Sequence, residues 1–122
     1  MPAAYHVIIA DDDAAIRALI ARVVARTYAR VTISAVPDGL DALLIYQQRG
    51  ADLVITNHEM PILSGLSLIE RLRVLSVTLP IIMVSAHPSA ESQAHTVGVT
   101  HFLLKPFLIG QLVQLLTRIL PP

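Results

Sequence analysis

Short apolar runs alternate with stretches of helical period five times along this chain, and this alternation constrains the fold more than any other feature. An apolar or β-branched run bounded by turn residues is typical of a buried strand, and apolar residues at three-and-four spacing are typical of a helix that packs on a core. The expected strands are Tyr5–Ala10, Val31–Val36, Leu53–Thr56, Ile81–Ser85 and Phe102–Leu104. The expected helices are Ala14–Tyr28, Leu40–Gln48, Ser64–Leu75, Ser89–Val97 and Leu108–Leu120.

Strands joined through helices pair in parallel, with helices on both faces of the sheet. Right-handed crossovers leave few topologies, and the flavodoxin-like one is usual at this length. We therefore predict an α/β fold of the flavodoxin-like (βα)5 type. Its five-stranded parallel sheet has the order 2-1-3-4-5, and residues 1–122 form a single domain.

Composition narrows the functional classes. Lys and Arg together number 9, as do Asp and Glu, so the net charge of +0 gives no sign of a nucleic-acid-binding surface. The hydrophobic fraction is 54%, yet no apolar run approaches the roughly 20 residues of a membrane span. The absence of cysteine excludes disulfides and thiolate metal sites. With no recognisable signal peptide, we expect a cytoplasmic protein.

Polar residues stand at or just past the ends of four expected strands: Asp11 with Asp12, Asn57, Ser85 and Lys105. The carboxyl ends of parallel strands share one edge of the sheet, and open α/β sheets place their chemistry there. We therefore expect these side chains to converge. This expectation depends on the strand assignments and on no single motif.

The acidic triplet at residues 11–13 is the strongest local signal. Asp13 precedes a helix and suits its N-cap, which needs only one carboxylate. Adjacent carboxylates repel unless a cation or a lysine offsets them, so Asp11 and Asp12 are predicted to form a Mg²⁺ site. Lys105 is the only lysine in the chain, and its ammonium suits contact with an anion. Four histidines lack the spacing of a metal cluster: His58, His87, His95 and His101.

The whole chain resembles the receiver (CheY-like) domain of bacterial two-component response regulators. The matching segments, in order, are Ile-Ile-Ala-Asp11-Asp12-Asp13, Met60-Pro61 followed by Gly65, Val84-Ser85-Ala86, and Gly98-Val-Thr-His-Phe102-Leu-Leu-Lys105-Pro106-Phe107. Each segment is weak alone, but this order and spacing over the full length are very specific.

The resemblance implies a phosphoryl transfer from a histidine kinase onto an aspartate at the end of the third strand. It also implies a Mg²⁺ ion held by Asp11, Asp12, the residue at position 57 and the carbonyl of Glu59. By the same resemblance, Ser85 and Lys105 would hold the phosphoryl oxygens. Phe102 would be the aromatic switch residue that, with Ser85, follows phosphorylation.

The chain departs from the family at its centre, where Asn57 stands in place of the acceptor aspartate. An amide is a very poor nucleophile, so no acyl phosphate can form on it, and its lack of charge weakens the predicted Mg²⁺ site. Three explanations remain open. The chain is a natural atypical receiver that acts through protein contacts, or an engineered unphosphorylatable form, or Thr56 takes the phosphoryl group, although strand alternation points Thr56 to the opposite face.

Two functional classes outside signalling share parts of this pattern. A flavin-mononucleotide binder needs a phosphate loop after the first strand, where this chain has three carboxylates. A Mg²⁺-dependent phosphatase with an aspartyl nucleophile would use two aspartates spaced like Asp11 and Asp13, and it is the better alternative. However, the chain leaves no room for a cap domain, and we expect no enzymatic activity.

The last helix has a wide apolar surface and a single charge, Arg118. Packing of this helix on a hydrophobic sheet would account for much of its apolar surface, but some of its leucines exceed what that packing requires. We predict that the fourth helix, fifth strand and fifth helix form a docking face for a homodimer or a partner. The partner would be a histidine kinase or another signalling protein, and the chain would be a stand-alone receiver or part of a larger regulator.

Overall fold

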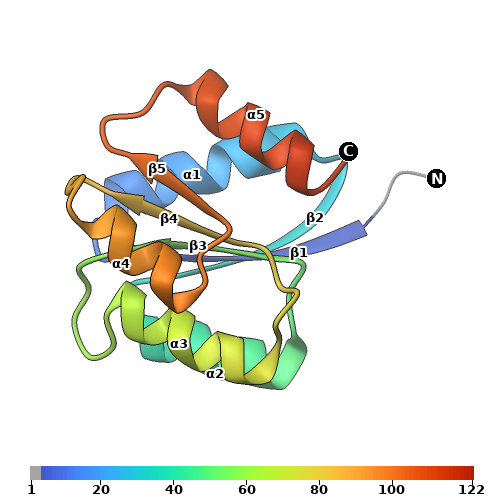
Figure 1. Ribbon diagram of the computed structural model, residues 1–122. Coiled ribbons are helices and arrows are strands. Elements are labelled where there is room, and N and C mark those ends of the chain that lie inside the picture. The colour runs from blue at the N-terminus through green and yellow to red at the C-terminus, as the bar shows by residue number, and fades with distance from the viewer. Residues whose placement is uncertain (1–3) are drawn as a thin grey trace.

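The computed structural model describes residues 4–122 and shows one parallel sheet between two layers of helices (Figure 1). The strand order is β2-β1-β3-β4-β5, and every neighbouring pair is parallel. The strands are β1 (Ala4–Ala10), β2 (Arg30–Val36), β3 (Leu53–Asn57), β4 (Ile81–Ser85) and β5 (His101–Leu104). The predicted flavodoxin-like fold, with order 2-1-3-4-5, is confirmed.

The helices lie on both faces of the sheet, as predicted. They are α1 (Ala14–Thr27), α2 (Gly39–Arg49), α3 (Gly65–Leu75), α4 (Ala90–Val97) and α5 (Ile109–Ile119). Helices α1 and α5 pack against each other on one face, and α2, α3 and α4 form the layer on the other face (Figure 1). None of the helices in residues 4–122 is long and apolar enough to cross a membrane.

Each face of the sheet has its own apolar core, because side chains alternate along a strand. Along β1, Val7 and Ile9 join the core under α1 and α5, while Ile8 and Ala10 join the core under α2 and α3. Strands β3 and β4 lie inside the sheet and are buried on both faces, which explains why their sequences are apolar without alternation.

Local capping sets the helix ends close to the predicted positions. Asp13 and Asp38 cap α1 and α2, as predicted, by accepting hydrogen bonds from backbone N–H groups of the first turn. Ser64 was expected inside the third helix but is its N-cap, accepting a bond from the backbone N–H of Ser67. Gly98 ends α4 with a φ of 107°, a left-handed conformation that suits a residue without a Cβ.

The wide apolar surface of α5 is mostly used inside the molecule. Leu112, Leu116 and Leu120 are buried, and Val113, Leu115 and Ile119 pack against the same core. This helix contacts α1 as well as the sheet, so it needs more than one apolar stripe. The apolar side chains that stay exposed near the predicted docking face are Leu104 and Leu108, whereas the exposed Ile109 lines a groove between α5 and α1.

The amino ends of the strands are closed by hydrogen bonds to the last residues of the chain. Tyr28 follows α1, is buried, and lies with its hydroxyl oxygen 2.9 Å from the carbonyl oxygens of both Leu116 and Leu120. The carbonyl of Leu116 also accepts from the backbone N–H of Leu120, whereas α5 leaves the carbonyl of Leu120 without an intrahelical partner. The hydroxyl proton that the two carbonyls share secures the end of α5. Burial raises the pKa of Tyr28 to about 12, with a smaller contribution from Tyr5.

Candidate functional site

A polar cavity of about 290 Å³ lies at the carboxyl ends of the strands, where the sequence predicts the site. Its lining comes from the ends of β1, β3, β4 and β5 and the loops that follow them. The lining residues are Asp11, Asp12, Asp13, Asn57, His58, Glu59, Ser85, Ala86, His87 and Lys105. The predicted convergence of Asp11, Asp12, Asn57, Ser85 and Lys105 is therefore present in the structure.

Asp11 is the most buried charge in the cavity, with 1% of its surface exposed. Its Oδ1 accepts a hydrogen bond from the backbone N–H of Asp13 at 2.9 Å, and its Oδ2 lies 3.2 Å from Nζ of Lys105. A buried carboxylate needs such partners because desolvation of an unpaired charge is costly. The lysine, one of the two offsets that the sequence suggested for the acidic pair, stabilises Asp11.

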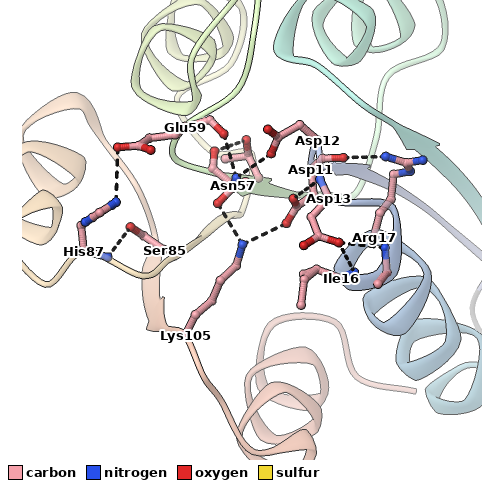
Figure 2. A network of polar contacts seen from close by, with 12 residues as sticks. Asp11, Asp12, Asp13, Ile16, Arg17, Asn57, Glu59, Ser85, His87 and Lys105 are labelled. Carbon is pink, nitrogen blue, oxygen red and sulfur yellow. Dashed lines mark hydrogen bonds and ion pairs between the residues drawn. The ribbon is translucent and has the colours of Figure 1, made fainter.

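Asp12 and Asp13 have different tasks. Asp13 Oδ1 accepts from the backbone N–H groups of Ala15 and Ile16, which commits this side chain to the start of α1. Asp12 is exposed, and its Oδ1 accepts a hydrogen bond from the side-chain amide of Asn57 at 3.1 Å (Figure 2). The acidic pair is therefore held by two different donors, Lys105 on Asp11 and Asn57 on Asp12.

Asn57 ends β3 and lies at the centre of the network in Figure 2. Its Nδ2 donates to Asp12 and to the backbone carbonyl of Glu59, the second bond at 2.8 Å. Its Oδ1 accepts from Nζ of Lys105 at 3.1 Å. The amide oxygen therefore faces the lysine, and the NH₂ group faces the acidic side.

The backbone around Asn57 is held by close packing against α3. Gly65, the first residue of α3, donates its N–H to the carbonyl of His58 at 2.8 Å. A Cβ at Gly65 would lie 2.1 Å from the carbonyl oxygen of Asn57. Only glycine allows the two backbones to approach this closely, so Gly65 determines how near the backbone of Asn57 lies to α3.

Lys105 reaches the cavity from the residue that follows β5. Its backbone N–H donates to the carbonyl of Ser85 at 2.8 Å, which extends the β4–β5 pairing up to the site. Its side chain is 18% exposed and contacts only Asp11 and Asn57 among the polar groups of the described chain. One ammonium thus joins the first, third and fifth strands (Figure 2).

Of the remaining predicted residues, Ser85 lines the cavity, and Phe102 and Thr56 do not. Ser85 is buried, and its Oγ accepts from the backbone N–H of His87 at 3.0 Å, which leaves the hydroxyl proton free to donate. Phe102 lies in β5 opposite Met83 and packs half-buried against the core under α3 and α4. Thr56 is fully buried, and its Oγ1 donates to the carbonyl of Asn57, so its hydroxyl has no access to the cavity.

The rim of the cavity contains a pair that sequence reasoning did not find. Nε2 of His87 lies 3.3 Å from Oε1 of Glu59, and both side chains are more than half exposed. The ring of His58 stands edge-on to that of His87, with 6.2 Å between centroids. Nothing in the sequence relates these residues, because His87 follows β4 and Glu59 follows β3.

The side chains of the cavity combine an acidic pair with a central amide, which is not a nucleophile. Within residues 4–122, no three side chains of His, Cys, Asp or Glu are grouped as metal ligands. The side chain of Glu59 turns outward to His87, and only its carbonyl faces the cavity. An amide at the centre can donate and accept hydrogen bonds but cannot form an ester or an anhydride at neutral pH.

Comparison with known families gives one match, and it covers most of the chain. The family described as "Response regulator receiver domain" matches residues 7–117. This range runs from β1 into the last turns of α5, and it includes every residue of the network in Figure 2.

Curated relatives share this segment as part of longer proteins. Sensor histidine kinase RcsC of Escherichia coli (strain K12) is 35% identical over 82 residues, which is 66% of this chain and 9% of RcsC. DNA-binding transcriptional regulator NtrC of the same strain is 29% identical over 112 residues, or 90% of this chain and 24% of NtrC. Transcriptional regulatory protein PrrA of Mycobacterium tuberculosis is 27% identical over 110 residues, or 88% of this chain and 46% of PrrA. The chain thus spans less than half the length of these relatives.

Solved structures agree over nearly the whole chain. Chemotaxis response regulator CheY4 of Vibrio cholerae is 29% identical with a TM-score of 0.85, over 97% of this chain and 100% of that one. The receiver domain of the Francisella response regulator 1452 is 29% identical with a TM-score of 0.81, over 94% of this chain and 95% of that one. The family match, the relatives and the fold all indicate the same kind of domain.

Proposed function

This chain belongs to the response regulator receiver domain family, and we propose that it is a receiver that works in two-component signalling without a phosphoryl group on residue 57. In this proposal, Asn57 occupies the position of the family's phosphoacceptor. The domain would signal through protein contacts, and it would have no enzymatic activity of its own.

The observation that carries the proposal is the set of contacts of Asn57. Its side chain lies at the centre of the cavity, between Lys105 on one side and Asp12 on the other. An acceptor aspartate would need to stand there to be within reach of both. Because an amide nitrogen is a very poor nucleophile, the chain keeps the surroundings of a phosphorylation site without the atom that reacts.

The family match gives no support to the phosphatase alternative. Asp13, the second acid that such an enzyme would need, is committed to capping α1. Asp11 is buried and paired with Lys105. Neither carboxylate is therefore placed as a free nucleophile or general acid.

The direct test is intact mass after incubation with a small-molecule phosphodonor and Mg²⁺, with Asn57→Asp alongside. We expect one added phosphoryl group on the variant and none on the present chain, because only the acceptor is missing. Labelling of the present chain would contradict the proposal. If neither protein were labelled, the surroundings of residue 57 would not support the reaction, and the assignment of Asn57 to the acceptor position would fail.

Thr56 is the alternative acceptor, and its burial argues against it. Its hydroxyl is fully buried and donates to the backbone carbonyl of Asn57. If the present chain were labelled, Thr56→Val would decide whether Thr56 takes the label. Label that survives this change would exclude Thr56.

For output, we propose contacts through the face of α4, β5 and α5, either in a homodimer or with a partner such as a histidine kinase. The exposed side chains of Leu104 and Leu108 give this face its apolar contact area. Sedimentation of the wild type and of Leu108→Asp at high concentration tests the homodimer. A wild type that stays monomeric would exclude self-association through this face.

A further inference from the structure

The charges of the acidic pair are offset in part from within the chain. Two carboxylates, Asp11 and Asp12, and one ammonium, Lys105, leave one net negative charge in the network around Asn57. An aspartate at position 57 would leave two. An excess of carboxylate oxygen favours the binding of a hard divalent cation, so the neutral side chain of Asn57 removes a large part of the electrostatic attraction for one.

Lys105 fixes the orientation of the Asn57 amide. A lysine ammonium has three donors and no acceptor, so the atom of Asn57 that faces it at 3.1 Å must be the oxygen. A flipped amide would set its NH₂ group against the ammonium and would lose the hydrogen bond. The NH₂ group is therefore directed to the opposite side, where Asp12 and the carbonyl of Glu59 lie.

Both NH₂ bonds end on oxygens that the family resemblance gives to the metal ion. Oδ1 of Asp12 accepts at 3.1 Å, and the carbonyl oxygen of Glu59 accepts at 2.8 Å. A cation that bound these two oxygens would meet the positive hydrogens of the amide between them. The residues present therefore do not fit a divalent cation in the arrangement that the structure shows.

We propose that the amide of Asn57 takes the place of the divalent cation. The NH₂ group of Asn57 and the ammonium of Lys105 then bind the acidic side chains of the site at any Mg²⁺ concentration. The proposal rests on the function proposed above and adds that the site has lost its metal requirement as well as its acceptor. Two hydrogen bonds from one NH₂ group join the loops after β1 and β3, and Lys105 adds the loop after β5.

Thermal unfolding with and without Mg²⁺ tests the proposal without any phosphodonor. We expect the melting temperature of the present chain to change by less than about 1 °C between EDTA and 10 mM Mg²⁺ at matched ionic strength. Asn57→Asp should melt lower in EDTA and rise by about 3–8 °C with Mg²⁺, if it binds the ion with a Kd of about 1 mM. A saturable rise of similar size in the present chain would overturn the proposal.

Asn57→Ala separates the role of the amide from the missing charge, because it removes the NH₂ group and adds no carboxylate. If the amide excludes the cation, the alanine variant should gain a Mg²⁺ response, smaller than that of Asn57→Asp. An alanine variant as insensitive as the present chain would overturn the proposal, because the missing charge alone would then explain the loss.

Paramagnetic broadening by Mn²⁺ gives a second readout at the site itself. The backbone amide resonances of residues 12 and 59 should stay sharp in the present chain and broaden in both variants. The two proposals fail separately: Mg²⁺ binding by the present chain without labelling overturns only the cation replacement, and labelling of the present chain overturns the proposed function.

Discussion

The two ends of the sheet contain polar networks of different kinds. At the amino ends of the strands, side chains bond mainly to backbone carbonyls at the ends of helices and in the tail. The hydroxyl of Tyr28 donates to the carbonyls of Leu116 and Leu120, and that of Tyr5 donates to the carbonyl of Pro121. Arg73 in the same way donates to the carbonyls of Gly98 and Ser76.

At the carboxyl ends, the central bonds join side chains to side chains. Lys105 contacts Asp11 and Asn57, Asn57 contacts Asp12, and Glu59 contacts His87. None of these groups satisfies an unpaired helix end, and burying the charge of Asp11 carries a desolvation cost that apolar side chains would avoid.

The difference separates a network that the buried backbone requires from one that it does not require. The bonds at the amino ends follow from the need to satisfy buried backbone groups, and any compact domain must meet it. Charges placed together at the other end have no such necessity, and this is typical of functional sites.

The largest effect is expected where the fold and the site share backbone. Gly65→Ala should cost about 3 kcal/mol or more of unfolding free energy, because the new Cβ overlaps the carbonyl of Asn57 and neither backbone can move freely. Urea unfolding measures the loss. Gly110→Ala in α5 is the matched control, since nothing lies within 4 Å of its Cβ position, and it should be neutral or stabilising. Equal effects of the two changes would show that the packing at Gly65 is not tight.

Removal of the shared cation should have the next largest effect. Lys105→Met leaves Asp11 buried without its ammonium partner, and we expect a loss of about 2–3 kcal/mol by urea unfolding. Arg26→Met, an exposed cation on α1, is the control and should change stability by less than about 0.5 kcal/mol. A loss at Lys105 no larger than at Arg26 would mean that the carboxyl-end network contributes nothing to stability.

The smallest effect is expected at the amino ends. Tyr28→Phe should cost about 1 kcal/mol at pH 7, the usual value of a buried hydroxyl bond. Because the pKa of Tyr28 is raised to about 12 from about 10, its contribution is complete below pH 10 and is lost as the pH rises towards 12.

Urea midpoints between pH 9 and 12 check this dependence on pH. The wild type should lose stability over the upper part of that range, and Tyr28→Phe should lose less. Tyr46→Phe in α2, on the other face of the sheet, serves as the control and should follow the wild type. Parallel curves for the wild type and Tyr28→Phe would mean that ionisation of Tyr28 is not coupled to unfolding.

Much of the fold could be predicted because its signals are local. The apolar run of β4 gave both of its ends correctly, and Asp13 and Asp38 showed where two helices begin. Errors fell at residues whose state depends on partners. Asn57 belongs to β3 because it pairs with Val84 in the neighbouring strand. Tyr28 ends α1 because its side chain packs in the core under α5 and bonds to the end of that helix.

The members of the site could also be found from sequence, because parallel strands bring their carboxyl ends to one edge. Which of these side chains bond to one another could not be predicted from the sequence. That Lys105 would bond Asp11 and the oxygen of Asn57, and that His87 would meet Glu59, depends on distances between loops far apart in the chain.

By itself the sequence determined the alternation of strands and helices, the acidic pair, and an amide at the end of the third strand. Only the tertiary structure decided which way that amide faces. Hydrophobic period and capping act within a few residues, so they are legible in the chain. The direction of the Asn57 NH₂ group follows from an ammonium 48 positions away, and only folding brings the two within 3.1 Å of each other.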